Sequence, residues 1–415
     1  MRRIILSLIC SAPLMAAELH VGPGQPHATV TAAVEAASPG DVIKVHSGVY
    51  REGNLRIAKP LTLEGIGFPV LDGGQKHEML SITAPDVRVT GFEFRDSGRS
   101  SMTDLAGVKI IETTRVTLEG NRFRDCHFGI HITRSTDCRI SGNDILGAID
   151  REQNTGNGIH LWHCARATIT GNTVRGQRDG IYLEFTTESL LEDNMVEKNL
   201  RYGLHFMFSH GNAYHRNSFQ SNGAGVAVMY SRDVEMSRNY FGLNWGAASY
   251  GLLLKEMTSG RITGNTFERN TTALTFDGSN RMTVEGNEFR ENGRAIQINA
   301  SSSTNVFSKN NFSGNAFDIA ASGELGDNRL EANYWDKYEG YDLRRDGTGD
   351  VPYRPVSLYA VMVDRVPPSV LLLRSPIVHV LDQAEKAFPS ITPETVKDDA
   401  PSMRPHSLET FRPAP

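Results

Sequence analysis

Apolar residues recur along the middle of the chain in one short pattern that repeats around an asparagine, at intervals of 22 to 29 residues. An apolar residue stands two positions after each of the first nine asparagines, and the slot three positions before is also mostly apolar. A fixed period of this length marks a solenoid, in which each repeat buries its apolar face only against its neighbours. The repeated asparagines are Asn121, Asn143, Asn172, Asn194, Asn217, Asn239, Asn265, Asn287, Asn310 and Asn333.

Within each repeat the apolar residues alternate, which is the period of a strand rather than of a helix. Short strands with glycine and asparagine at the corners predict an all-β chain folded as a right-handed parallel β-helix, with coils about 4.8 Å apart. The asparagines are predicted to turn inward, each amide bonding the next as in stacked cross-β ladders. Their role is therefore structural. A second pattern, glycine followed by alternating apolar residues, begins at Gly129, Gly158, Gly180, Gly203, Gly225 and Gly251.

The rest of the chain frames this solenoid. The first residues have basic positions, a short apolar run and small residues before the expected cleavage site, as in a secretory signal. An Ala-rich pattern at Val30–Ala37 predicts a helix that covers the end of the rod. The predicted segments are a signal peptide (1–17), an N-terminal cap with the first coils (18–92), the β-helix repeats (93–333), a C-terminal cap and appendage (334–388) and an extended Pro-rich tail (389–415).

Composition restricts the possible partners and the compartment. The net charge of −5 is spread without basic blocks, which gives no footprint for nucleic acid. Three cysteines remain after the signal segment, Cys126, Cys138 and Cys164, and an odd number in an oxidising compartment leaves at least one thiol unpaired. We expect small buried core residues, with a Cys126–Cys138 bridge as the open alternative.

One strand face carries residues that can do chemistry. In the glycine pattern the third and fifth positions point outward, which places His131, His160, Tyr182 and His205 in one column beside Trp162, Glu184, Met207 and Met229 in the next. Two long repeats, with insertions at Asp150–Gly156 and around Asn244–Tyr250, are expected to flank this same face.

Thioether and imidazole groups together suit soft Cu(I). The sequence therefore predicts a transient copper (Cu+) site, with Met207, Met229, His205, His160 and His210 as candidate ligands. The alternative interpretation is that the methionines cover a surface that binds a partner.

An enzyme of the polysaccharide lyase or epimerase type is the other function to weigh, because such enzymes use this fold. They need an acid/base pair, or Ca²⁺ held by aspartates beside a basic residue, within a groove. The candidate face offers one carboxylate, Glu184, and Arg178-Asp179 is expected at a turn away from it. The oxygen-rich segment from Asp342 to Asp350 lacks the spacing of an EF-hand and is expected to be a capping turn.

Several motifs together resemble the NosD family of pectin-lyase-like β-helix proteins. They are the cap sequence from Ala32 to Glu52, the asparagine coils, the sequence Gly203-Leu-His-Phe-Met-Phe-Ser-His210, and the block from Asn333-Tyr-Trp-Asp to Asp346-Gly-Thr-Gly-Asp-Val-Pro-Tyr353. The resemblance covers roughly residues 18–388.

The resemblance implies a periplasmic accessory protein of nitrous-oxide reductase maturation. Such a protein docks on an ABC transporter made of a membrane subunit and an ATPase. It receives copper from a copper-donor lipoprotein and helps to build the copper–sulfide centre of nitrous-oxide reductase. It is a chaperone rather than an enzyme, and this chain has no phosphate-binding Gly-x-x-x-x-Gly-Lys-Ser/Thr loop of its own.

Overall fold

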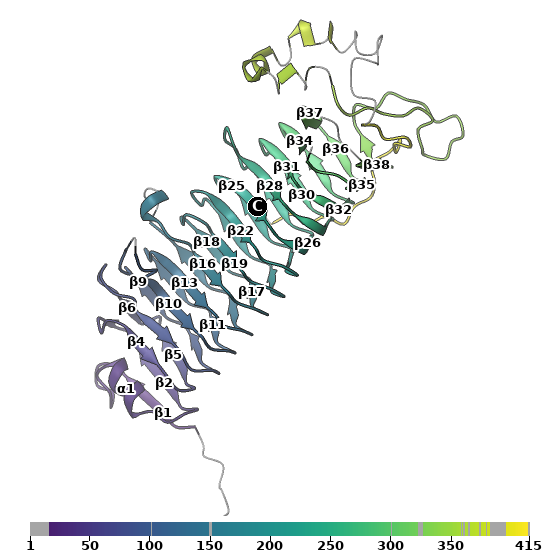
Figure 1. Cartoon of the computed structure of the whole chain (residues 1–415). Coiled ribbons are helices and arrows are strands. Elements are labelled where there is room, and N and C mark those ends of the chain that lie inside the picture. Colours follow the sequence, from purple (N-terminus) through teal and green to yellow (C-terminus); the bar gives the residue numbers. More distant parts are fainter. Residues whose placement is uncertain are drawn as a thin grey trace, which may run out of the picture.

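The chain forms a long rod of stacked coils, each made of short strands, as the computed structural model shows (Figure 1). Every strand pair between coils of the described residues is parallel, so the predicted all-β parallel solenoid is confirmed. Its predicted right-handed sense stays a prediction. The predicted signal peptide lies, up to residue 15, outside the described residues. The structure describes residues 16–413 apart from 101, 149–151, 300, 323–326, 358, 360–361, 364–365, 373–374, 379 and 382–395.

Three sheets run along the rod, and the coils contribute one strand to each of them in turn. In the described part of the chain, sheet A has 14 strands, sheet B has 13 and sheet C has 12. Sheet A comprises β1 (Glu18–Val21), β2 (Val42–His46), β5 (Thr62–Ile66), β8 (Arg88–Thr90), β11 (Thr117–Glu119), β14 (Arg139–Ser141), β17 (Thr168–Thr170), β20 (Leu190–Glu192), β23 (Ala213–His215), β26 (Arg232–Ser237), β29 (Thr258–Thr263), β32 (Asn280–Glu285), β35 (Val306–Ser308) and β38 (Arg329–Glu331).

Sheet B comprises β3 (Val49–Tyr50), β6 (Val70–Asp72), β9 (Glu93–Arg95), β12 (Arg122–Arg124), β15 (Asp144–Leu146), β18 (Thr173–Arg175), β21 (Met195–Glu197), β24 (Ser218–Gln220), β27 (Tyr240–Gly242), β30 (Thr266–Glu268), β33 (Glu288–Arg290), β36 (Asn311–Ser313) and β39 (Tyr334–Trp335). Sheet C comprises β4 (Leu55–Ile57), β7 (Leu80–Ile82), β10 (Ala106–Ile111), β13 (Phe128–Thr133), β16 (Ile159–Trp162), β19 (Ile181–Glu184), β22 (Tyr202–Met207), β25 (Ala224–Met229), β28 (Tyr250–Lys255), β31 (Thr272–Asp277), β34 (Arg294–Asn299) and β37 (Phe317–Ser322).

The predicted asparagine ladder lies at the corner between sheets A and B. Asn217 Nδ2 donates to Asn239 Oδ1 at 3.0 Å, and the backbone N–H of Asn194 donates to Asn217 Oδ1 at 3.0 Å. A second ladder, which we did not predict, lies at the corner between sheets B and C, where Asn199 Nδ2 donates to Asn222 Oδ1 at 2.9 Å. Both ladders satisfy buried polar groups that would otherwise destabilise the fold. The second ladder comprises Asn199, Asn222, Asn244, Asn270, Asn292 and Asn315.

The glycine at the start of the middle strands of sheet C, such as β19 and β22, is required by close approach of the coils. A Cβ at Gly180 would lie 2.6 Å from the carbonyl oxygen of Gly203 in the next coil. Inside the solenoid, apolar side chains of sheet B stack in register, with ring centroids of Phe267 and Phe289 4.8 Å apart. These contacts bury the phenylalanines completely.

One α-helix lies at the N-terminal end of the rod, and short helical segments follow the last coils (Figure 1). Helix α1 (Val30–Ala36) starts after Thr29, whose hydroxyl accepts from the backbone N–H of Ala32 at 3.2 Å, and it packs on β1 and β2. The helix predicted from the Ala-rich pattern is confirmed, although its capping role stays a prediction. Short 3₁₀ turns lie at η1 (Glu152–Asn154) and η2 (Pro367–Leu372), and residues 359, 362–363, 376–378 and 380–381 are also helical. In the described residues no helix is long and apolar enough to cross a membrane.

All three cysteines are buried in the core, as predicted, and none of them forms a disulfide. Burial raises the pKa of Cys126 and of Cys138 to about 12, and that of Cys164 to about 11. They are therefore neutral thiols that fill space, and the alternative of a Cys126–Cys138 bridge is wrong.

The C-terminal tail returns to the rod and closes the asparagine ladder. Asp398, which is fully buried, accepts from the backbone N–H of Asn333 at 2.9 Å, from Asn333 Nδ2 at 3.0 Å and from the indole N–H of Trp335 at 3.2 Å. The two bonds from Asn333 are those that the next asparagine accepts in the preceding coil, where Asn333 accepts them from Asn310. A carboxylate suits this last position because it accepts hydrogen bonds and has none to donate.

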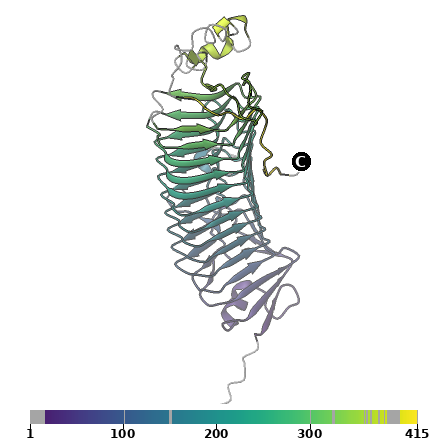
Figure 2. The ribbon, with the colours of Figure 1, turned by 90° about the vertical axis from the view of Figure 1, so that its right-hand side faces the viewer.

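Beyond Asp398 the tail lies along the flank of the last coils (Figure 2). The backbone N–H of His406 donates to Asn311 Oδ1 at 2.9 Å, and Thr266 Oγ1 donates to the carbonyl of Phe411 at 3.1 Å. Residues 403–413 have no regular secondary structure, so hydrogen bonds to the rod hold an extended strap.

Candidate functional site

The outer face of sheet C carries a column of stacked rings in the middle of the rod. Strand register places His131 beside His160, followed by Tyr182 and His205, and we call these four residues the ring column. Successive ring centroids lie 4.9, 4.7 and 4.5 Å apart, with angles of 19°, 18° and 10° between the planes. The rings stand outside the solenoid, as predicted, because their strand neighbours point inward.

The histidines of the ring column are nevertheless buried, with exposed fractions of 4% for His131, 8% for His160 and 6% for His205. The ring of Phe128 stacks on His131 at 5.4 Å, and the ring of Tyr202 packs on His205 at 4.9 Å. The expectation that these histidines form part of the outer surface is therefore wrong. They lie on the outer side of the sheet, but beneath other side chains.

The two predicted insertions do flank this face. Both connect sheet B to sheet C, the first before β16 and the second before β28. Thr155 and Asn157, at the end of the first insertion, are buried, and Tyr250 at the end of the second stacks on Tyr202 at 6.3 Å. The insertions therefore help to exclude water from the outer face.

Imidazole nitrogens of the ring column have no hydrogen-bond partner among the described residues. They are Nδ1 of His131 and both ring nitrogens of His160 and of His205. Burial lowers the pKa of His131 to about 4 and that of His160 to about 3, so both rings are neutral at pH 7. Neutral imidazoles with free lone pairs are competent metal ligands.

A buried carboxylate lies at the end of the ring column. Asp179 is fully buried, accepts from Arg201 Nε at 2.8 Å, and has Oδ2 at 3.5 Å from His205 Nδ1. Burial alone would raise the pKa of Asp179, but its contacts with His205 and Arg201 lower it to about 2. Arg178-Asp179 does lie in the turn before β19, as predicted. Sequence reasoning missed that the Asp179 side chain reaches His205, because no local pattern links this turn to β22.

The two candidate methionines are neighbours. Register pairs Met207 of β22 with Met229 of β25, and both side chains are half-buried. The phenol of Tyr182 donates to Met207 Sδ at 3.5 Å. His205 precedes Met207 by two residues and points to the same side of the strand.

Of the five predicted ligands, Met207, Met229 and His205 lie on the neighbouring strands β22 and β25, on the outer side of sheet C. His160 is separated from His205 by the ring of Tyr182, and its Nε2 lies 4.0 Å from Glu184 Oε2. His210 lies past the corner that follows β22. Stacked imidazoles direct their lone pairs side by side rather than toward one another, so neighbouring rings of the column do not form a linear two-coordinate site.

The described part of the chain has no cluster of side chains arranged to hold a hard metal ion. No group of three or more His, Cys, Asp or Glu side chains there is arranged to hold a metal ion. Asp342 accepts backbone N–H bonds from Asp346 at 3.2 Å and from Gly347 at 2.8 Å, as in the turn predicted for this segment. The soft site predicted from thioethers and an imidazole stays a prediction.

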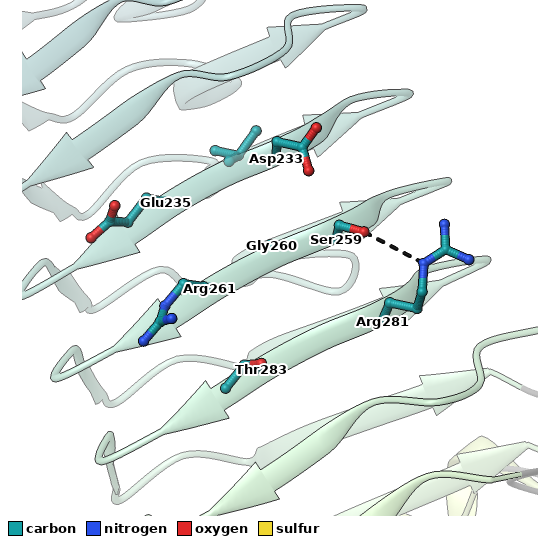
Figure 3. Close-up of a pocket in the computed structure, with 8 residues that line it drawn as sticks. Asp233, Glu235, Ser259, Gly260, Arg261, Arg281 and Thr283 are labelled. Atoms are coloured by element: carbon teal, nitrogen blue, oxygen red, sulfur yellow. Dashed lines mark hydrogen bonds between the residues drawn. The ribbon is translucent and has the colours of Figure 1, made fainter.

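A shallow hollow of about 350 Å³ lies on the outer face of sheet A (Figure 3). Asp233 and Glu235 come from β26, Arg261 from β29 and Arg281 from β32, and all four are exposed. Arg281 Nε donates to Ser259 Oγ at 3.4 Å. These charges stay in water, unlike the desolvated acid/base pair that a lyase or epimerase needs.

Comparison with known proteins places the chain in a family. A family model described as "Periplasmic copper-binding protein (NosD)" matches residues 146–340, and one described as a protein of unknown function matches residues 21–231. The chain is similar to the "Probable ABC transporter binding protein NosD" of Stutzerimonas stutzeri, with 31% identity over 87% of this chain and 86% of that protein. It is 32% identical to the protein of the same name from Pseudomonas aeruginosa, over 86% and 87% of the two chains.

Solved structures share the fold at low identity. A GH87 α-1,3-glucanase from Streptomyces thermodiastaticus has a TM-score of 0.62 and 17% identity, over 80% of this chain and 71% of that one. A family 28 exopolygalacturonase of Yersinia enterocolitica has a TM-score of 0.53 and 11% identity, over 76% and 78%. These likenesses concern the architecture alone, whereas the sequence relatives extend over nearly the whole chain. The expected family and periplasmic location are confirmed: the chain belongs to the NosD family of periplasmic copper-binding proteins.

Proposed function

We propose that this protein is a metallochaperone that carries Cu(I) transiently for the copper–sulfide centre of nitrous-oxide reductase. It would receive copper from a copper-donor lipoprotein while docked on an ABC transporter, whose membrane subunit and ATPase supply the energy. The description of its family as copper-binding and the name of its relatives as transporter-binding proteins support this role. We also propose that the β-helix winds in the right-handed sense and that both ends of the rod are capped.

The observation that carries the proposal is the adjacency of Met207, Met229 and His205 on one outer face. Two thioethers and one imidazole form a soft ligand set, which favours Cu(I) over Ca²⁺ or Mg²⁺. Both methionines are half-buried, so a cargo ion would be partly shielded from water yet open to exchange. These properties suit transient carriage better than permanent storage.

His160 and His210 have a secondary place in this proposal. His160 lies on the far side of Tyr182, and His210 lies past the corner, so either would reach the ion only after its side chain or the ion moved. The three nearer residues are therefore the ligands to test first. An enzymatic function has less support, because the buried carboxylate Asp179 is ion-paired to Arg201 rather than poised for proton transfer.

Anaerobic Cu(I) titration against a competing chelator tests the proposal. The mature chain is expected to bind copper, and Met207→Ala/Met229→Ala is expected to weaken the affinity by at least about tenfold, or about 1.4 kcal/mol. Met195→Ala, which removes an exposed methionine from sheet B, is the matched control and should bind as the wild type does. If the double variant retains the wild-type affinity, copper is not held on this face.

A further inference from the structure

An exposed line of aromatic rings follows one corner of the rod, beside the candidate copper face. It consists of His163, Phe185, Phe208 and Tyr230, which we call the aromatic ridge. The ring centroids lie 4.6, 5.2 and 5.1 Å apart and the planes differ by 8°, 7° and 17°. Each residue follows the last strand position of sheet C in its coil, and its N–H donates to the next coil. The ridge is therefore one continuous stack over four coils.

The backbone makes this choice of residues unusual. Each ridge residue has a left-handed conformation, with φ from 50° to 52°, which costs a non-glycine residue about 1–2 kcal/mol. The same kind of position at other corners holds polar residues such as Asp193, Arg216 and Lys198. Stacking offsets part of this cost, at about 0.5–1.5 kcal/mol per pair.

The ridge is only half covered. Phe185, Phe208 and Tyr230 keep 39%, 38% and 37% of their surface exposed. Met207 and Met229 immediately precede Phe208 and Tyr230 in sequence, so apolar surface continues onto sheet C. A contiguous apolar patch of this kind on a protein surface marks an interaction site.

The geometry of the stack limits what can bind. A sugar ring binds an aromatic residue by lying on its face, but in the ridge the faces lie against one another and Trp162 packs at 84° on His163. What remains exposed are the ring edges, which form a narrow apolar crest. A crest of this shape fits an apolar groove on another protein.

The charges around the ridge indicate the sign of the partner. Glu184 precedes Phe185, Glu188 follows it by three residues, and Glu256 occupies the next rung after Tyr230. Among the described residues, neither Glu188 nor Glu256 has an ion pair within 4 Å, and Glu184 approaches only the neutral ring of His160. Arg134 and Arg166 nearby are paired with Glu112 and Asp137, and Lys255 approaches Asp277 at 4.0 Å. Arg166 also interacts with the charge of Glu188. Carboxylates still outnumber cations at the rim, so its net charge is negative.

We propose that the aromatic ridge is a docking surface for a protein with an apolar groove bordered by lysine and arginine. A second copy of this chain would bring two acidic rims together, which disfavours self-association. Because the ridge adjoins Met207 and Met229, a protein bound there would bring its own metal site to the candidate copper site. That placement rests on the proposed function, whereas the surface itself does not.

Binding measurements with metal-free proteins separate docking from copper binding. The probes are the copper-donor lipoprotein and nitrous-oxide reductase, each tested against the mature chain by calorimetry or surface plasmon resonance. Phe185→Gly/Phe208→Gly removes two rings and suits the left-handed backbone, so the coils are retained. Asp193→Gly/Arg216→Gly makes the same change at another corner of the same coils and is the matched control.

The ridge variant is expected to weaken binding of one probe by at least about tenfold, while the control changes it less than twofold. Charge reversal at Glu188 and Glu256, to lysine, should slow association and reverse its salt dependence. Wild-type binding of both probes by the ridge variant, or failure of both probes to bind the wild-type chain, overturns the inference. So does a wild-type dimer in sedimentation that the ridge variant loses.

The proposed copper site and the proposed docking surface can be contradicted independently of each other. If the ridge variant loses the probe but titrates with Cu(I) as the wild type does, docking and metal binding are distinct functions of neighbouring surfaces, as proposed. If the wild-type chain binds no Cu(I) yet holds a probe through the ridge, the copper site is wrong and the docking surface stands.

Discussion

The same repeat builds two stacked columns in this protein, one inside the rod and one outside, and they differ in how their polar atoms are satisfied. In the asparagine ladder each amide donates to the next coil and accepts from the previous one. In the ring column the imidazole nitrogens of His160 and His205 are buried without hydrogen bonds. Unpaired buried polar groups destabilise a fold. The asparagine ladder therefore stabilises the protein, whereas the ring column lowers its stability.

The largest effect is expected from a break in the inner column. Asn217→Ala would remove the hydrogen bonds that Asn217 Oδ1 accepts from the N–H and Nδ2 of Asn194, and those that Asn217 Nδ2 donates to Asn239 Oδ1 and to the carbonyl of Leu191. At about 1 kcal/mol for each lost bond, with a further penalty for the N–H of Asn194 that loses its partner, the free energy of unfolding should fall by about 4 kcal/mol or more. Urea unfolding measures it.

Met195→Ala, an exposed change in the coil of Asn194, is the control and should cost less than about 0.5 kcal/mol. Asn217→Asp is a sharper variant, because it keeps the shape but sets a carboxylate against Asn239 Oδ1. Should Asn217→Asp prove as stable as the wild type, the ladder would not depend on its donors.

Removal of the last rung of the ladder should cost less stability than a break in its middle, and it should also release the tail. Asp398→Ala removes the acceptor for the N–H and Nδ2 of Asn333 and for the indole of Trp335, at an expected cost of about 3 kcal/mol. The tail strap would then detach, and limited proteolysis should cut residues 399–413 sooner. Asp398→Asn keeps one acceptor oxygen but sets an amide donor against the N–H of Ala332, so it should cost less than Asp398→Ala but more than an exposed change. Equal losses for the two variants would show that charge, rather than the acceptor, holds the tail.

The outer column should make the protein sensitive to acid. Since His131 and His160 have pKa values of about 4 and 3 in the folded chain, against about 6.5 when unfolded, the unfolded chain binds more protons between these values. Stability is therefore complete above pH 6.5 and falls as the pH drops toward 4, by about 1 kcal/mol per histidine per pH unit. Asp179, whose pKa is about 2, contributes only below pH about 4.

Unfolding in urea at several pH values tests this expectation. His131→Phe/His160→Phe keeps two stackable rings and should flatten the profile between pH 6.5 and 4. The exposed His77 provides the control, since His77→Gln should leave the slope unchanged. An unaltered acid profile in the double variant would assign the sensitivity to other groups.

Sequence periodicity predicted the inner column because its asparagines recur at one slot in every coil. The second ladder was equally visible, since Asn199, Asn222 and Asn244 each stand five positions after an anchor asparagine, but we did not follow that offset. The outward direction of the ring column followed from strand alternation. Its burial did not, because the covering rings of Phe128 and Tyr202 stand in the slot before the glycine, where other coils have Asn157, Asp179 or Ala224.

Contacts between distant segments could not be predicted from the sequence. Asp179 meets His205 across a coil, and Asp398 follows Asn333 by 65 residues, far outside the period. Neither residue type nor spacing marks Asp398 as the last rung of an asparagine ladder. The site residues Met207 and Met229 could be paired from the period alone, whereas the separation of His160 from them by Tyr182 needed the stacking geometry.

The smallest expected effect is also the one that distinguishes the two columns most directly. Tyr182→Phe keeps the stacked ring but removes the hydroxyl that donates to Met207 Sδ at 3.5 Å. Because hydrogen bonds to a thioether are weak, the free energy of unfolding should change by less than about 0.5 kcal/mol. Release of the sulfur lone pair should leave the Cu(I) affinity unchanged or raise it by up to about threefold, about 0.6 kcal/mol. A tenfold loss of Cu(I) affinity would instead mean that the phenol orients Met207, and that the outer column is held in place by its polar contacts as the inner one is.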